Sequence, residues 1–189
     1  MGQIVLIRHG ETEWSAASRH TSYTELPLTP RGEDEARRLG KVLAGQAFTA
    51  VLCSPRRRAR QTAELAGFTV SAVVEDLVEW NYGEYEGATT AEIRQWRPDW
   101  SLWRDGCPGG ESPDQVAARI DHLHSGVRPL VGQGDVALIG HAHSLRVVAA
   151  RWLGLPAAGG AMFRLDVARL SILGYEREQP VLLRWNSPT

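Results

Sequence analysis

The sequence predicts an α/β fold, a three-layer α/β/α sandwich whose central sheet is mostly parallel and carries an antiparallel edge strand. Short, continuously apolar runs alternate with longer stretches in which apolar residues recur every three or four positions. The first pattern is typical of strands buried on both faces, and the second of helices that cover a sheet. Strand-like runs follow one another at the end of the chain, which indicates antiparallel pairing at one edge.

Three apolar runs are the strand candidates for the parallel part of the sheet, and they span residues 4–7, 51–52 and 136–139. No polar residue interrupts them, as expected when helices lie on both sides of the sheet. Residues 162–185 are predicted to form two or three short strands joined by turns, which would supply the antiparallel edge.

Two helices are predicted in the first half of the chain. The first follows Thr29, a favourable N-cap, and has Pro30 at its first position. Apolar residues such as Leu39 give this helix one buried stripe, and its opposite face is charged. The second helix is predicted to begin at Ser54, with Pro55 directly behind it.

Two further helices are predicted in the second half. Ser112, followed by Pro113 and Gln115, forms a capping-box pattern that marks a helix start. The last helix follows the strand that ends at Gly140, because apolar residues then repeat at helical spacing until Gly154 ends the pattern.

The length and composition predict a single domain over residues 1–189, since 43% hydrophobic content supplies one sizeable core. The chain passes from Met1 directly into a strand-like run, so we expect no export leader, no membrane segment and a cytoplasmic location. Cys53 and Cys107 are too few for a disulfide framework. We expect both thiols to be reduced and Cys53 to be buried.

Charge argues against a nucleic-acid partner. The formal net charge is −1, whereas binding to a phosphate backbone depends on an excess of cations. The basic run at residues 56–58 is short, and only one of the 21 basic residues, Lys41, is lysine. We therefore expect a small-molecule partner, with no nucleic acid and no membrane.

Cationic and imidazole side chains follow three of the predicted strands. Arg8 and His9 follow the first, Arg58 lies shortly after the second, and His141 follows the third. Ligands of parallel sheets bind beyond the carboxyl ends of the strands, so these groups are expected to meet. Guanidinium groups suit the charge of a phosphoryl group in transfer, and an unprotonated imidazole can attack phosphorus. We expect His9 to be the nucleophile.

Four segments of the sequence, taken in their order along the chain, are similar to the motifs of one known family. The chain resembles the histidine phosphatase superfamily, in its phosphoglycerate-mutase-like branch, in four motifs. They are Arg8-His9-Gly10-Glu11-Thr12, residues 54–63, residues 77–87 and Gly140-His141. The resemblance covers residues 4 to about 152. The chain is most similar to the bacterial acid-phosphatase and sedoheptulose-bisphosphatase-like members, which implies phosphatase activity on small phosphomonoesters such as sugar phosphates or phosphoglycerates.

The resemblance also implies roles for individual residues. Arg8, Arg58 and His141 match the phosphate pocket, and His9 matches the histidine that becomes phosphorylated. Glu79 matches the acid that protonates the leaving oxygen, with Glu84 and Glu86 as nearby alternatives. The implied reaction needs no metal and no other cofactor. Because Glu79 must be protonated and His9 neutral, we expect a bell-shaped pH–rate profile that is best at mildly acidic to neutral pH.

The resemblance places the substrate mouth in two segments. Ser15 stands where many relatives have asparagine, which keeps a hydroxyl donor and loses an amide. Further candidate contacts in the first segment are Arg19, His20, Thr21 and Thr24, and in the second Ala142 and His143. His143 has two interpretations at this point, as a substrate contact or as a cap of the helix that follows.

Other chemistries fit the residues less well. A cysteine phosphatase would need arginine six positions after its cysteine, and Ala59 occupies that position relative to Cys53. His141 and His143 are without an evident third metal ligand.

A phosphoglycerate mutase is one open alternative, although mutases of this family are typically longer. A non-catalytic module that binds phosphate or phosphoprotein is another. A homodimer is also open, since tryptophans at near-helical spacing, Trp96, Trp100 and Trp103, suit a core, a lid or an interface.

Overall fold

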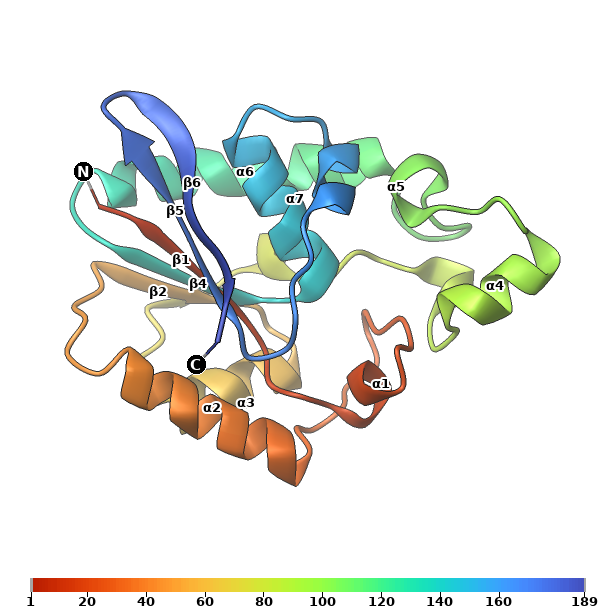
Figure 1. The fold of residues 1–189 in the computed structure, drawn as a ribbon, viewed down its shortest axis with the longest axis horizontal. Coiled ribbons are helices and arrows are strands. Elements are labelled where there is room, and N and C mark those ends of the chain that lie inside the picture. Colours follow the sequence, from red (N-terminus) through yellow and green to blue (C-terminus); the bar gives the residue numbers. More distant parts are fainter. Residues whose placement is uncertain (1, 189) are drawn as a thin grey trace.

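The computed structural model describes residues 2–188 and contains a six-stranded sheet in the order β3-β2-β4-β1-β5-β6 (Figure 1). The strands are β1 (Ile4–Arg8), β2 (Ala50–Cys53), β3 (Ala72–Val73), β4 (Val136–Gly140), β5 (Leu170–Glu176) and β6 (Gln179–Ser187). The first four are parallel to one another, β5 pairs antiparallel with β1, and β6 pairs antiparallel with β5. The predicted mostly parallel sheet with an antiparallel edge is confirmed.

Helices cover both faces of this sheet, with α2 and α3 on one side and α6 and α7 on the other (Figure 1). The helices are α1 (Glu13–Ala16), α2 (Pro30–Val42), α3 (Arg57–Leu65), α4 (Thr90–Trp96), α5 (Leu102–Asp105), α6 (Pro113–Val131) and α7 (Ala142–Trp152). Short 3₁₀ turns are η1 (Glu75–Leu77), η2 (Gly83–Tyr85) and η3 (Ala157–Met162). This is the predicted three-layer α/β/α arrangement.

Alternating residues of β1 supply both cores. Ile4 and Leu6 pack with α6 and α7, whereas Val5 and Ile7 pack with α2 and α3. All four side chains are fully buried. Because successive side chains of a strand point to opposite faces, an uninterrupted apolar run is what a sheet covered on both sides requires.

Two of the predicted helix starts are confirmed by their caps. The Thr29 hydroxyl accepts a hydrogen bond from the Gly32 N–H, and Pro30 occupies the first turn of α2. At the start of α6, Ser112 and Gln115 form both hydrogen bonds of the capping box. These caps act over three residues, so the local sequence is enough to specify them.

The predicted start of the second helix is wrong by three residues. Helix α3 begins at Arg57, with an extended Arg56 as its N-cap. Ser54 continues the sheet, since its N–H donates to the Ile139 carbonyl, and its hydroxyl contacts the ring of His141 at 2.7 Å. Locally, the hydroxyl keeps only a 3.4 Å contact with the Arg56 N–H, and its shorter contact is with a distant part of the chain.

The C-terminal strands begin later than the sequence indicated. Residues 157–162 form η3 against α7, and β5 starts only at Leu170.

Cys53 and Cys107 are both free and buried, and burial raises the pKa of each thiol to about 12. Within residues 2–188, no helix combines the length and the apolar character needed to cross a membrane.

Candidate active site

The imidazole of His9 lies directly beyond the end of β1. Its backbone N–H donates to the Gly140 carbonyl at the end of the adjacent strand β4. Its Nδ1 lies 2.7 Å from the Gly10 carbonyl oxygen, and since a carbonyl only accepts, Nδ1 carries the proton. The lone pair of Nε2 is consequently available for chemistry.

A close backbone contact fixes the turn that follows His9. A Cβ on Gly10 would collide with the carbonyl oxygen of Gly32 in α2, so only glycine fits there. The Gly10 N–H donates to the Thr62 hydroxyl at 3.0 Å, and that hydroxyl donates to the Arg58 carbonyl. Thr62 thus links the turn bearing His9 to the helix bearing Arg58.

Arg58 and His141 form a second buried unit beside His9. The guanidinium Nε of Arg58 donates to Nδ1 of His141 at 3.1 Å, which places the imidazole proton on Nε2, where it donates to Ser54. The rings of His9 and His141 are 5.2 Å apart between centroids. The remaining guanidinium nitrogens of Arg58 donate to backbone carbonyls at Thr21, Ser22 and Thr24.

Burial keeps both histidines neutral. The pKa of His9 lies well below its ordinary value because its ring is desolvated and because Arg58 and Arg8 are cationic neighbours. Desolvation and the charge of Arg58 lower the pKa of His141 in the same way. A neutral His9 with a free Nε2 lone pair has the protonation state that a nucleophile needs.

Arg8 ends β1 and contributes a second guanidinium to the site. Its Nη1 donates to the Leu165 carbonyl at 2.6 Å, whereas its buried Nε has no hydrogen-bond partner among residues 2–188. Burial lowers the pKa of this guanidinium, and Glu79 is the acidic neighbour that most opposes the shift. A buried donor with no protein partner is a candidate contact for an anionic ligand.

The carboxylate of Glu79 lies at the N-terminus of α7. One oxygen accepts hydrogen bonds from the N–H groups of Trp80 and Ser144, and the other accepts from the N–H of His143. Free N–H groups at a helix start favour an acidic group at this position. Both oxygens are therefore fixed in orientation at the edge of the site.

Arg8, His9 and Glu79 line a cavity of about 370 Å³. Of the residues predicted from the sequence, those that line it are Arg8, His9, Ser15, Arg19, His20, Thr21, Glu79, Ala142 and His143. Arg58 and His141 are almost fully buried next to it and do not line it, and neither does Thr24. Of the three candidate acids, only Glu79 is among the lining residues.

Two polar residues at the mouth have structural contacts. The Ser15 hydroxyl pairs with Thr12 in a capping box at the start of α1. Glu86, one of the alternative acids, accepts hydrogen bonds through its carboxylate from the backbone N–H groups of Ser22 and Thr24. Glu86 therefore holds the segment 21–24 through its N–H groups, and Arg58 holds it through its carbonyls.

His143 does not cap α7 through its side chain, because Glu79 accepts from the N–H groups there. Its Nδ1 instead lies 2.6 Å from the hydroxyl of Tyr82, a residue that the sequence did not single out. Arg146 also lines the cavity and was also missed. Its position three residues after His143 on a predicted helix was the available signal.

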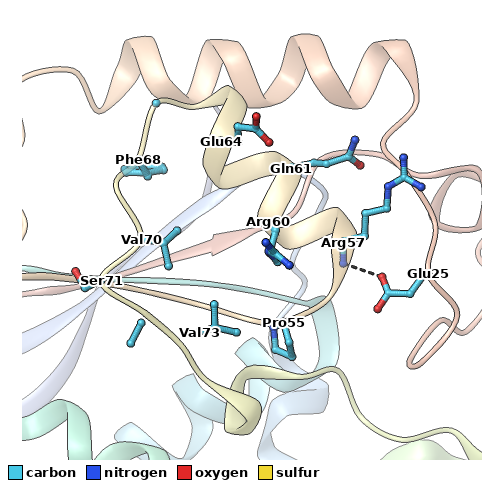
Figure 2. A pocket seen from close by; sticks show the side chains of 12 residues that line it. Glu25, Pro55, Arg57, Arg60, Gln61, Glu64, Phe68, Val70, Ser71 and Val73 are labelled. Atoms are coloured by element: carbon cyan, nitrogen blue, oxygen red, sulfur yellow. Dashed lines mark hydrogen bonds between the residues drawn. The ribbon is translucent and has the colours of Figure 1, made fainter.

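Residues 2–188 contain no group of three or more His, Cys, Asp or Glu side chains that could hold a metal ion. A larger cavity, of about 950 Å³, lies between α3 and the segment leading into β3 (Figure 2). It shares no lining residue with the cavity around His9. The larger cavity therefore contains neither His9 nor Glu79, both of which line the smaller one.

Comparison with known proteins identifies the family. The model of the histidine phosphatase superfamily (branch 1) matches residues 4–188. The chain belongs to this superfamily. An acid phosphatase of Mycobacterium tuberculosis is 44% identical over 176 residues, which cover 92% of this chain and 87% of that protein.

Two further comparisons place this histidine phosphatase among its relatives. The sedoheptulose 1,7-bisphosphatase of Saccharomyces cerevisiae is 38% identical over 182 residues, which cover 80% of this chain and 67% of that protein. A solved structure of a Mycobacterium tuberculosis open reading frame has a TM-score of 0.96 at 41% identity, and the match covers 99% of this chain and 98% of that one. The predicted family, fold and phosphatase class are confirmed.

Proposed function

We propose that this histidine phosphatase hydrolyses small phosphomonoesters through a phosphohistidine intermediate on His9 and works as one domain over residues 1–189. The observation that carries the proposal is the 2.7 Å contact between Nδ1 of His9 and the Gly10 carbonyl, which leaves Nε2 unprotonated at the cavity. The substrate would be a phosphorylated metabolite of the sugar phosphate or phosphoglycerate type.

In the first step, Nε2 of His9 attacks phosphorus in line with the ester oxygen, and the bond from phosphorus to that oxygen breaks. Arg8, Arg58 and His141 bind the equatorial oxygens, on which the negative charge is spread. Arg58 and His141 donate to other protein groups in the free enzyme, so phosphate binding requires them to redirect or share these hydrogen bonds.

Glu79 supplies the proton that the leaving oxygen needs, because an alkoxide is a poor leaving group. In the second step, Glu79 accepts a proton from water, and the oxygen of that water attacks the phosphorus bound to His9. Inorganic phosphate then leaves and Nε2 regains its lone pair. No metal and no organic cofactor takes part in either step.

The proposal is tested by rapid acid-free quenching of the enzyme with p-nitrophenyl phosphate, followed by mass spectrometry of the peptide containing His9. We expect a phosphoryl group on Nε2 and stoichiometric release of inorganic phosphate, both absent in H9N. Isomerisation of 3-phosphoglycerate without phosphate release would identify a mutase. Binding without any turnover would identify a non-catalytic module.

A matched control is available for this experiment. His122 is exposed and paired with Asp76 on the outer surface of α6. The H122N variant is expected to retain the phosphorylated His9 peptide and the rate of phosphate release, because the change is confined to a solvated ion pair.

A further inference from the structure

Two cavity-lining side chains take no part in the reaction proposed above. His143 and Arg146 are three residues apart near the start of α7, a spacing that places them on the same face of the helix. Both line the cavity that contains His9 and Glu79. They form a pair of nitrogen donors in the same cavity as the reacting groups.

Trp103 from α5 contacts both members of this pair. The guanidinium carbon of Arg146 lies 4.4 Å from the Trp103 ring centroid, and the His143 ring lies 5.3 Å from it between centroids. Gly160 makes this packing possible, because a Cβ there would come within 2.5 Å of the Trp103 ring. Trp103 therefore holds the pair in place before any ligand arrives, through a cation–π contact with Arg146 and a T-shaped contact with His143.

Arg146 carries a positive charge without an ion-pair partner. Its Nε and one Nη donate to the backbone carbonyls of Gly160 and Ala161, and no carboxylate within residues 2–188 forms a salt bridge with it. Burial lowers its pKa to about 10, with Glu79 as the main opposing charge. The other Nη remains available to an anionic ligand.

His143 is fixed as a neutral donor. Burial raises the pKa of Tyr82 well above its ordinary value, so its phenol keeps its proton and donates to Nδ1 of His143. Burial also lowers the pKa of His143, and the single ring proton must then lie on Nε2. No residue between 2 and 188 accepts a hydrogen bond from this Nε2.

We propose that Arg146 and His143 bind a second anionic group of the substrate, a phosphate or a carboxylate, at the opposite end from the phosphoryl group that His9 attacks. This rests on the proposed function and narrows its substrates to compounds with two anionic ends, such as sugar bisphosphates and phosphorylated hydroxy acids. Monoesters with a neutral tail leave the charge of Arg146 unpaired and bind more weakly.

The first test measures kcat/KM for matched substrate pairs. Fructose 1,6-bisphosphate is compared with fructose 6-phosphate, and 3-phosphoglycerate with glycerol 3-phosphate, which distinguishes a phosphate from a carboxylate as the second group. We expect a preference of about 10- to 100-fold for the doubly anionic member of at least one pair, the range of a charge-assisted hydrogen bond. The R146M variant is expected to abolish this preference.

Arg128 supplies the matched control. Its guanidinium also stacks on a tryptophan, 4.8 Å from the Trp152 ring centroid, but it does not line the cavity. R128M therefore removes a comparable arginine–tryptophan contact and is expected to keep the substrate preference. Equal kcat/KM for both members of both pairs in the wild type, or an unchanged preference in R146M, would overturn the inference.

A binding measurement separates this inference from the proposed function. In the H9A background, which cannot form phosphohistidine, calorimetry compares the dissociation constants of the same substrate pairs. We expect H9A to bind the doubly anionic member about 10- to 100-fold more tightly and H9A/R146M to bind both members equally. If no substrate is hydrolysed by the wild type, the proposed function fails, whereas this affinity difference still decides the role of Arg146.

Discussion

Arg58 donates from its guanidinium Nε to Nδ1 of His141 at 3.1 Å, so a permanent cation determines which nitrogen of the imidazole carries the proton. We expect R58Q to lower kcat/KM for p-nitrophenyl phosphate by about 10²- to 10³-fold, because the site loses a donor to the transferred phosphoryl group. Steady-state kinetics measures the loss, and R57Q is the control. Arg57 is the exposed neighbour in α3 whose backbone N–H binds Glu25. A comparable loss in R57Q would contradict the role given to Arg58.

Glu79 is expected to matter in proportion to how poor the leaving group is. For a sugar phosphate, E79Q should lower kcat by about 10²- to 10⁴-fold, since an alkoxide needs a proton. The loss in the phosphorylation step should be smaller for p-nitrophenyl phosphate, whose phenolate leaves unaided. Single-turnover rates for the two substrates check this difference. The control is E84Q, which alters an exposed carboxylate outside the cavity. Equal losses of rate for both substrates in E79Q would count against proton donation by Glu79.

The pH dependence of the rate should reflect the lowered pKa of His9. A neutral nucleophile persists below pH 6.5 in the folded enzyme, so the acid limb of kcat/KM is expected to lie below that value. A pH–rate profile in buffers of constant ionic strength measures this limb, and an acid limb at or above pH 6.5 would contradict the neutral state assigned to His9.

Gly10 is expected to tolerate no side chain. G10A should lower the free energy of unfolding by about 1–3 kcal/mol and displace His9, because the added Cβ meets the Gly32 backbone. Urea denaturation gives the change in stability. Gly126 in α6 has open space at its Cβ position, so G126A is the control and should stabilise by about 0.5–1 kcal/mol. Equal stability of G10A and the wild type would show that the contact can relax.

His124 should make the fold sensitive to acid. Burial lowers its pKa to about 4, and its Nε2 has no hydrogen-bond partner among residues 2–188. In the unfolded chain His124 takes up a proton near pH 6.5, whereas in the folded protein it does so only near pH 4. The contribution of this group to the free energy of unfolding is therefore full above pH 6.5 and falls by up to about 3 kcal/mol as the pH drops toward 4. Urea denaturation between pH 7.5 and 4 should show a shallower loss in H124L than in the wild type. The exposed His122 is the control, and H122L should keep the wild-type loss.

The sequence predicted the features that depend on neighbours along the chain. The caps at Thr29 and Ser112 and the apolar runs of β1 and β4 are local patterns, and they specified most of the sheet and its covering helices. The ends of parallel strands lie at one edge, so the arrangement of His9 beside His141 also followed from the order of elements.

Features that depend on distant contacts were not predictable in this way. The Ser54 hydroxyl matched a cap locally, but in the fold it contacts the distant ring of His141 and the helix begins three residues later. Tyr82 becomes relevant only because η2 brings it to His143, and Arg146 only because Trp103 packs beneath it. The short helices α4 and α5 were missed because a few residues of helical spacing carry too little signal.

The alternation of side chains along β1 restricts which changes in chain length this enzyme can accept. Ile4 and Leu6 face one layer and Val5 and Ile7 the other, and Arg8 and His9 continue the same strand into the cavity. An inserted or deleted residue within this strand would exchange the two layers and at the same time turn the nucleophile away from phosphorus. Length changes are therefore excluded from this segment by folding and by catalysis together.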